Sequence, residues 1–152
     1  MHTPDPLTAR RAEFRFSHPI AVRFNDFDLL GHVNNAVYLT FCEAARFAYL
    51  TSVGGDIQQS DLNLILAHIS IDYRRPVGWG DAVEICARTV AVGTKSFTME
   101  YLILGTGGAG EYIAAEARSV QVGYDYTAGR SAPLLPAVVT ALEAFEGRPL
   151  RG

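Results

Sequence analysis

Residues 34–53 read NNAVYLTFCEAARFAYLTSV, and this stretch decides the fold. Apolar side chains recur along one face at helical spacing, at Val37, Tyr38, Phe41, Cys42, Ala45, Ala48 and Tyr49. The opposite face is nearly as apolar, with Ala36, Leu39, Ala44, Phe47 and Leu50. We expect Asn34 or Asn35 to cap the start of this helix and Gly54-Gly55 to end it. Because the helix is apolar on most sides, other elements have to enclose it.

Strand-like segments rich in Ile, Val, Tyr and Phe follow the helix, at about residues 63–74, 82–92, 95–104 and 111–124. The connections Pro76–Asp81 and Gly93-Thr94 are short, which is typical of neighbouring antiparallel strands. An antiparallel sheet that curls around the long helix buries the apolar surface of both. The sequence therefore predicts an α+β fold with the helix inside the sheet.

Shorter elements are predicted on either side of this core. From Phe14 to Phe24 the apolar residues fall mostly at alternate positions, and Pro19 places this strand at a sheet edge or a bulge. Near the end of the chain, Pro136 opens a short amphipathic helix that Gly147 stops. We therefore expect a flexible lead-in, a single domain and a C-terminal tail, over residues 1–12, 13–147 and 148–152 respectively.

The composition excludes several classes of function. The chain has 152 residues, of which 49% are hydrophobic, and its formal net charge of −3 offers no basic surface for nucleic acid. It has no run of about 18 apolar residues and no segment that resembles a signal peptide. We therefore expect a cytoplasmic protein without a membrane partner. Cys42 and Cys86 lack the spacing of a zinc site and are expected to be reduced core residues.

Polar residues concentrate in the segment 23–35, RFNDFDLLGHVNN, which leads directly into the long helix. A helix start presents unpaired N–H groups and partial positive charge, so it can polarise a carbonyl oxygen. Of Asp26 and Asp28, only one is expected to face the helix start. Either could instead cap the helix or hold the turn. A metal site built from Asp26, Asp28 and His32 is a further alternative, but it lacks the ligand spacing of such sites, and we expect no metal or cofactor.

Residues 26–38, DFDLLGHVNNAVY, together with Glu43–Arg46 resemble the signature of hot-dog-fold acyl-CoA thioesterases of the 4-hydroxybenzoyl-CoA thioesterase type. The similarity continues through Ile71–Val77 and Gly93–Phe97, so it covers about residues 16–125. It implies the hot-dog fold, in which an antiparallel sheet wraps one long central helix. It also implies hydrolysis of an acyl-CoA to the free acid and CoA, by a homodimer assembled into a homotetramer.

By this resemblance Asp28 is the catalytic carboxylate, which attacks the thioester carbonyl or activates a water. The backbone N–H of Asn35 takes the position that stabilises the oxyanion. Gly31 lets the loop pass close to the acyl group, and His32 belongs to the same catalytic motif. Tyr38, which ends the motif, is expected to contact the substrate.

Coenzyme A carries phosphates, for which an acidic protein needs local cations. Arg74, Arg75 and Lys95 are the candidates, with Ser96 beside the last of them, and arginine suits phosphate because its planar group donates two hydrogen bonds. In the family these positions lie near the nucleotide, often across a subunit boundary. Each of these charges could equally be a solvated strand-end residue.

Three other interpretations stay open. Glu43 competes for the catalytic role, although it lies about 12 Å along the helix axis from Asn35 and could simply pair with Arg46. A hot-dog enoyl-CoA hydratase or dehydratase would pair Asp26 or Asp28 with His32. A non-catalytic module would bind acyl-CoA without chemistry.

Residues Gly105–Gly110, GTGGAG, match the dinucleotide-binding pattern, and Asp125 lies twenty residues after the first glycine. That motif requires a helix to start immediately afterwards, whereas Ser119–Tyr124 is typical of a strand. We therefore predict that these glycines form a flexible hairpin tip.

Overall fold

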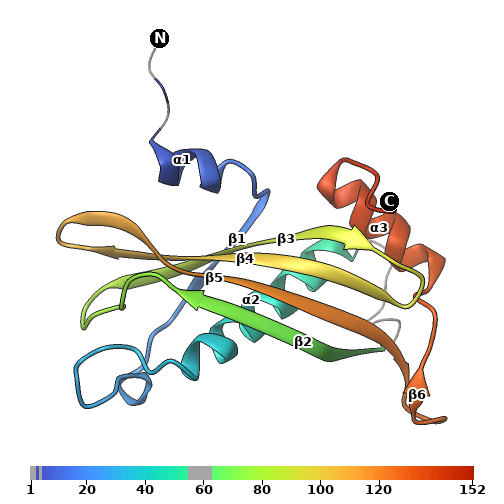
Figure 1. Ribbon diagram of the computed structural model, residues 1–152, viewed down its shortest axis with the longest axis horizontal. Helices are drawn as coiled ribbons and strands as arrows, with labels where there is room; N and C mark the ends of the chain where they lie inside the picture. Colours follow the sequence, from blue (N-terminus) through green and yellow to red (C-terminus); the bar gives the residue numbers. More distant parts are fainter. Residues whose placement is uncertain (1–2, 4, 55–62) are drawn as a thin grey trace.

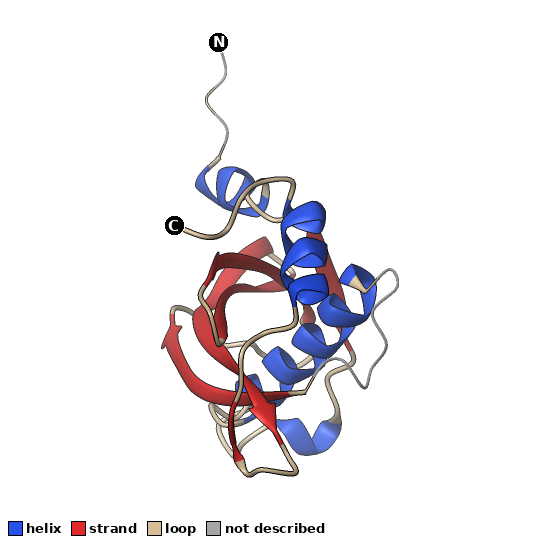
Figure 2. Ribbon diagram, turned by 90° about the vertical axis from the view of Figure 1, so that its right-hand side faces the viewer, coloured by secondary structure: helices blue, strands red, loops and turns tan. Residues whose placement is uncertain are grey.

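The computed structural model describes residue 3 and residues 5–54 and 63–152, in which one curved antiparallel sheet lies against a long helix (Figures 1 and 2). The elements in chain order are α1 (Pro6–Arg11), β1 (Phe16–Ile20), the 3-10 turn η1 (Phe24–Asp26), α2 (Val37–Val53), β2 (Leu64–Tyr73), β3 (Ala82–Val92), β4 (Ser96–Gly107), β5 (Gly110–Asp125), β6 (Arg130–Ser131) and α3 (Pro136–Glu146). The predicted hot-dog arrangement of sheet and central helix is confirmed. Among the described residues, no helix combines the length and apolar character needed to cross a membrane.

The sheet has the order β1-β3-β4-β5-β2, and β6 pairs with β5 beyond this path. The prediction that β2 and β3 are neighbours, made from the short segment between them, is wrong. Strands β3, β4 and β5 fill the centre as consecutive hairpins, so β1 and β2 are left to the two edges. The segment 74–81 crosses the end of the sheet, where the Val33 amide donates to the carbonyl of Val77 at 2.9 Å. Pro19 lies in edge strand β1, as predicted.

The glycine-rich segment forms the β4–β5 hairpin, with Gly107 opposite Gly110, and no helix follows it. This confirms the predicted hairpin tip. Gly105 lies inside β4, where a Cβ atom would come within 2.3 Å of the Tyr112 ring. The small residue is therefore needed for close packing between the strands and not for binding a nucleotide.

The sheet covers only one face of α2. The buried side chains of this face lie against the concave side of the sheet and include Tyr38, Cys42, Ala45, Tyr49 and Val53. On the other face Leu39 and Phe47 are 41% and 62% exposed. In a single chain, the expected enclosure of this helix is therefore formed on one face only.

The ends of α2 differ slightly from the prediction. The helix begins at Val37 after Ala36, and no side chain caps it. The side chain of Asn34, two residues before the N-cap position, instead accepts a hydrogen bond from the Ala36 amide at 2.9 Å. Gly54 ends the helix, whereas Gly55 lies outside the described residues.

Helix α3 ends at Gly147 as predicted and is fastened to α2 by a buried carboxylate. Tyr49 of α2 donates to Glu146 at 2.6 Å, and the Thr89 amide donates to the same oxygen at 3.0 Å. Burial raises the pKa of the Tyr49 hydroxyl, so it stays a donor. The C-terminal tail is attached to the sheet, because Leu150 is buried and its carbonyl accepts from the Val92 amide at 3.0 Å.

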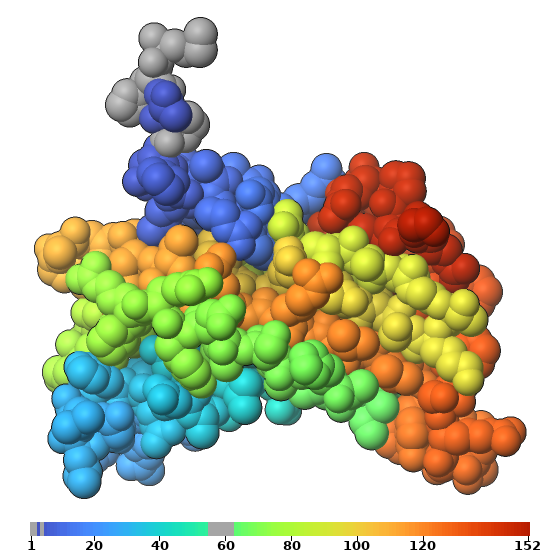
Figure 3. Space-filling view, in the orientation of Figure 1, coloured from blue at the N-terminus to red at the C-terminus, as the bar shows by residue number. Residues whose placement is uncertain are grey.

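Helix α1 occupies the segment expected to be a flexible lead-in. Arg10 donates to Glu116 of β5 at 2.8 Å, and Arg11 donates to Glu111 at 2.9 Å. The helix lies against the convex side of the sheet, where Figure 3 shows its atoms beside those of β5. It covers the second apolar cluster, Cys86, Leu102 and Leu104.

Both cysteines are free and buried, as predicted. Burial raises the pKa of the Cys42 thiol to about 12 and that of the Cys86 thiol to about 11. Neither thiol therefore has the thiolate character of a catalytic nucleophile at neutral pH.

Candidate active site

Asp26 anchors the loop that joins β1 to α2. It is only 1% exposed and accepts from the Arg23 amide at 2.7 Å and from the Arg23 guanidinium at 3.0 Å. Its own carbonyl accepts from the Asn34 amide at 2.8 Å, which closes the loop. Burial acts to raise the pKa of Asp26, but the hydrogen bonds and charge of Arg23 outweigh it and hold the pKa below its ordinary value.

Asp28 lies at the outer turn of the same loop, and its side chain is exposed. Its Oδ1 atom accepts from the amides of Leu30 and His32, at 2.9 and 3.2 Å. Gly31 completes the turn with a φ of +79° and open space around it. The carboxylate is therefore held by its own backbone, and Oδ2 has no hydrogen-bond partner in the described part of the chain.

His32 is exposed and pairs as an isolated bridge with Gly78. The three residues considered for a metal site do not converge, because Asp26 turns to Arg23 and Asp28 to the loop amides. Over the described ranges, no group of three or more His, Cys, Asp and Glu side chains is placed to hold a metal ion.

Asn35 lies two residues before the first residue of α2. Its carbonyl accepts from the hydroxyl of Tyr73 at 2.6 Å, whereas no described residue accepts a hydrogen bond from its amide. Tyr73 is therefore an additional residue of the candidate site. Tyr38 lies in the core instead of facing solvent, and its ring packs edge-on against the Tyr73 ring at 5.1 Å.

Arg74 and Arg75 follow Tyr73 directly and so lie at the same end of the molecule. Arg74 donates to Glu116 at 3.2 Å, and its side chain is 53% exposed. The Arg75 guanidinium lies 4.4 Å from the centre of the Tyr112 ring. Both cations are held in place at the rim of the site.

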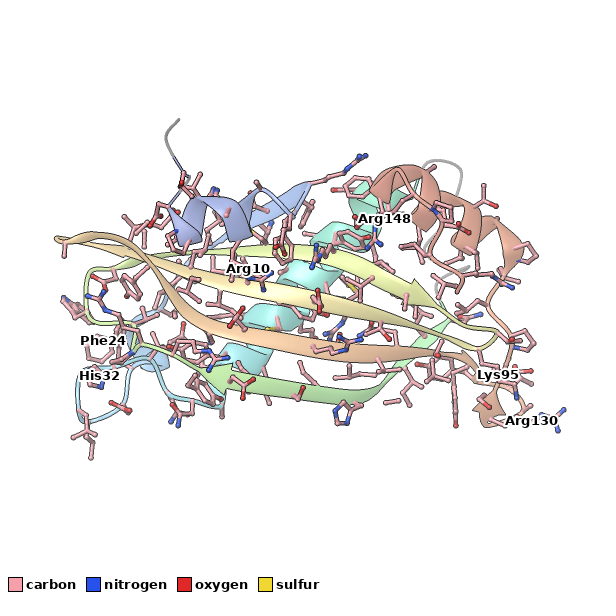
Figure 4. The ribbon with its side chains drawn as sticks, turned by 45° about the horizontal axis from the view of Figure 1, so that its top comes forward. Arg10, Phe24, His32, Lys95, Arg130 and Arg148 are labelled. Atoms are coloured by element: carbon pink, nitrogen blue, oxygen red, sulfur yellow. The ribbon has the colours of Figure 1, made fainter. Side chains whose placement is uncertain are left out.

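Lys95 and Ser96 lie far from these residues. Figure 4 labels His32 at one end of the molecule and Lys95 at the other. The Lys95 ammonium contacts the Ser131 hydroxyl at 3.4 Å. A single chain therefore brings Asp28, Gly31, His32, Asn35 and the two arginines together, and does not bring Lys95 or Ser96 to them.

The comparisons with known proteins agree with the fold. The Thioesterase-like superfamily matches residues 22–142, which include the loop, α2 and the central strands. The chain belongs to this superfamily. The specific 4-hydroxybenzoyl-CoA type is not singled out by the match.

Members with solved structures or known names resemble the chain over different lengths. A thioesterase from Thermus thermophilus, crystallised with coenzyme A and Zn, is 38% identical, with a TM-score of 0.79 over 91% of this chain and 98% of that one. The YsmA protein of Bacillus subtilis is 29% identical over 64% of this chain and 66% of its own length. The 1,4-dihydroxy-2-naphthoyl-CoA hydrolase of Synechococcus elongatus is 30% identical over 59% of this chain and 68% of its own length. The chain thus spans just under two thirds of the Bacillus relative.

Glu43, the competing carboxylate, lies on the exposed face of α2. It borders a shallow groove of about 480 Å³ together with Thr40 and Phe47. The predicted pair with Arg46 is not formed, because Arg46 turns under the sheet and donates to the Tyr101 hydroxyl at 3.2 Å. In this chain Glu43 therefore lies outside the loop that holds Asp28 and Asn35.

Proposed function

We propose that this chain hydrolyses an acyl-CoA thioester to a free carboxylic acid and CoA. The observation that carries the proposal is that one segment, between η1 and α2, holds both an ordered, exposed Asp28 carboxylate and an Asn35 amide to which no described residue is bonded. Membership of the superfamily supports it, as do the names of the acyl-CoA hydrolases that the chain resembles.

The chemistry follows from the two groups. The thioester oxygen accepts a hydrogen bond from the Asn35 amide, which stabilises the developing oxyanion by about 3 kcal/mol in typical enzymes. Asp28 then attacks the carbonyl carbon, which expels the CoA thiolate and leaves an anhydride that water cleaves. In the other route Asp28 takes a proton from a water whose oxygen attacks the same carbon, and the thiolate leaves with a proton. Both routes yield the acid and the thiol.

The remaining predicted residues have supporting roles in this proposal. Gly31 and His32 form the turn that orients Asp28, and Arg74 and Arg75 receive phosphates of the substrate. Tyr38 contributes by holding the ring of Tyr73, whose hydroxyl fixes Asn35.

We propose that the working form is a homodimer assembled into a homotetramer, because Lys95 and Ser96 can approach the substrate only from a second copy. The exposed apolar face of α2 is the surface available for such contacts. We place the protein in the cytoplasm, where two buried free thiols remain reduced.

The decisive variant is Asp28→Asn. We expect kcat to fall by roughly 10²- to 10⁴-fold while acyl-CoA binding and the melting temperature stay unchanged, because the amide keeps the shape of the carboxylate at an exposed position. Thiol release, followed with a disulfide dye over a panel of acyl-CoAs, measures the rate, and calorimetry measures the binding.

Asp5→Asn is the matched control, because Asp5 is an exposed carboxylate that also accepts from a backbone amide, that of Thr8 at 3.4 Å, and it lies at the start of α1, outside the loop that holds Asp28. It should hydrolyse at the rate of the unchanged protein. Undiminished hydrolysis by Asp28→Asn would remove Asp28 from its role. Loss of the ultraviolet band of an enoyl-CoA without thiol release would indicate a hydratase, and saturable binding without any turnover would indicate a binding module.

A further inference from the structure

An open groove of about 360 Å³ lies at the end of the molecule where Figure 4 labels Phe24 and His32. The rings of Phe24, Phe27 and Trp79 line it, and we call it the aromatic groove. The Trp79 ring meets the Phe24 ring edge-on, with 5.8 Å between their centres, and lies 4.9 Å from the Phe27 ring. Nevertheless Trp79 is 66% exposed and Phe24 is 78% exposed. The groove therefore presents aromatic surface that the described part of the chain leaves uncovered.

One carboxylate borders the aromatic groove. The Oδ2 atom of Asp81 accepts from the Tyr112 hydroxyl at 2.5 Å and from the Gly78 amide at 3.4 Å. The Oδ1 atom accepts no hydrogen bond from the described residues, and it is not buried. A ligand in the groove can therefore donate an N–H group to this oxygen.

A cation is attached to the same group of residues. The Arg75 guanidinium lies 4.4 Å from the centre of the Tyr112 ring, whose hydroxyl is bonded to Asp81. Among the described residues, no carboxylate lies within ion-pair distance of Arg75. Its planar group is therefore available for the oxygens of a phosphate.

These three features together select the chemistry of a ligand. Exposed aromatic rings bind the flat face of a base by stacking. The open oxygen of Asp81 favours a base that carries an amino group, and Arg75 favours a phosphate. An acyl chain would use only the aromatic surface and would leave both polar groups without a partner. The set of groups is therefore that of a site for an adenine nucleotide.

The aromatic groove lies within reach of a thioester bound at Asn35. The Val33 amide donates to the Val77 carbonyl at 2.9 Å, and Asn35 and Trp79 each lie two residues beyond this contact. Two residues span at most about 7 Å and the contact itself about 5 Å, so Asn35 and Trp79 lie within about 19 Å of each other. The arm of CoA between the sulfur and the diphosphate has about 13 bonds and spans up to about 16 Å, to which the diphosphate adds its own length.

We infer that the aromatic groove binds the adenine nucleotide of the acyl-CoA, with the base stacked on Trp79 and Phe24. The amino group of the base donates to Asp81, and Arg75 binds a phosphate. This inference rests on the proposed hydrolysis for the identity of the substrate. The groove then selects a thioester of CoA over one carried on a protein, which has the phosphopantetheine arm but no adenine.

The test uses the intrinsic fluorescence of the protein. Trp79 is the only tryptophan in the chain, so the tryptophan emission of the full chain reports on the aromatic groove. Adenosine 3′,5′-bisphosphate, which is the nucleotide part of CoA, is titrated in one series and phosphopantetheine, the other part, in a second. We expect the nucleotide to quench the emission saturably, because the base stacks on the indole ring, and phosphopantetheine to leave it unchanged.

Two variants of Trp79 separate stacking from folding. Trp79→Leu should weaken binding of the bisphosphate roughly tenfold in calorimetry, because it keeps an apolar side chain but removes the ring. Trp79→Phe keeps a ring and should stay within about threefold of the unchanged protein. Tyr126→Leu is the control, since Tyr126 is similarly exposed, at 63%, but lies near β6, and it should bind normally. If Trp79→Leu does not fold, the fluorescence titration of the unchanged protein decides alone.

An emission that ignores the nucleotide but shifts to the blue with a decanoyl-pantetheine thioester would overturn the inference and assign the groove to the acyl chain. An emission that changes only with protein concentration would overturn it in favour of a second copy. Nucleotide binding without hydrolysis of any acyl-CoA would support the inference and defeat only the proposed function. Hydrolysis of acyl-CoA without nucleotide binding in the groove would defeat the inference alone.

Discussion

Two aspartates of one loop take opposite positions in this protein. Residues two apart point to the same side of an extended backbone, but Asp26 ends the 3-10 turn η1, and the structure buries Asp26 while exposing Asp28. Spacing alone could not decide which of them faces a substrate, because both fit the pattern of a turn-holding residue. The difference in burial distinguishes Asp26, whose carboxylate holds the loop, from Asp28, whose carboxylate is available for chemistry.

Because Asp26 is buried and Asp28 is exposed, replacing each of them with asparagine should change the stability of the protein by different amounts. Asp26→Asn should lower the free energy of unfolding by about 1–3 kcal/mol, since it removes a buried charge-assisted hydrogen bond with Arg23. Denaturation in urea at neutral pH measures the change, and Asp28→Asn is the comparison, with an expected change within about 0.5 kcal/mol. Equal destabilisation by the two variants would mean that Asp28 also holds the loop.

Side-chain pairing within a helix was less predictable than the helix itself. The spacing of Glu43 and Arg46 favours an ion pair, but Arg46 reaches the buried Tyr101 hydroxyl instead. An exposed pair of this kind contributes only a few tenths of a kcal/mol, so a tertiary hydrogen bond easily outweighs it. Helical spacing alone does not indicate which helix residues bond to the sheet.

Helix α1 was missed for a similar reason. Its six residues carry two arginines and little apolar surface, so the segment has no helical periodicity to detect. Its order comes from distant partners, because Arg10 and Arg11 pair with glutamates of β3 and β5. The capping Asp5 and the proline at the first turn are the local signals that could have indicated it.

The attachment of α1 should weaken in acid. The hydrogen bond from Arg10 lowers the pKa of Glu116 from its ordinary value near 4.5, so the stabilisation is fully present above that pH and is lost as the pH falls through the lowered pKa. Glu116→Gln should therefore cost about 1 kcal/mol or less at pH 7 and nothing once the pH is well below 4. Urea denaturation of both proteins between pH 3 and 7 tests this.

Arg74 also pairs with Glu116, so two arginine variants identify the partner that matters. Arg10→Gln should reproduce the pH dependence of Glu116→Gln, and Arg74→Gln should do so only weakly. If the free energies of unfolding of Glu116→Gln and the unchanged protein differ by the same amount over the whole pH range, the ion pair does not stabilise α1.

The strands could be located from sequence but not ordered. The alternation and punctuation that predicted them are local, and the structure extends β4 and β5 only by a few residues into the glycine segment. The segment 74–81 determines which strands are neighbours, because it crosses the end of the sheet. It is held there by the buried Val77, whose carbonyl accepts from the Val33 amide. Such contacts join residues that are far apart in the chain, so the local sequence pattern of a strand cannot predict them.

The whole molecule presents two features that a single chain leaves unresolved. The predicted site residues lie at opposite ends, with the catalytic candidate His32 at one and the substrate-binding candidate Lys95 at the other (Figure 4). The outer face of α2 exposes apolar side chains, although the sequence pattern predicts that other elements cover them. A second copy packed on this face would resolve both, because it would cover α2 and could bring its own Lys95 to the first site.

Phe47→Glu tests this assembly. Phe47 is 62% exposed in the single chain, so the isolated fold should lose little stability, whereas a charge at the centre of an apolar interface should weaken association at least roughly 10²-fold. Light scattering after gel filtration should show a smaller species, and thiol release should fall with it because Lys95 and Ser96 no longer reach the substrate. Tyr126→Glu is the control, since Tyr126 is equally exposed, at 63%, but lies near β6 and away from α2. A Phe47→Glu protein with unchanged mass and activity would show that α2 is not the interface and that one chain forms the complete site.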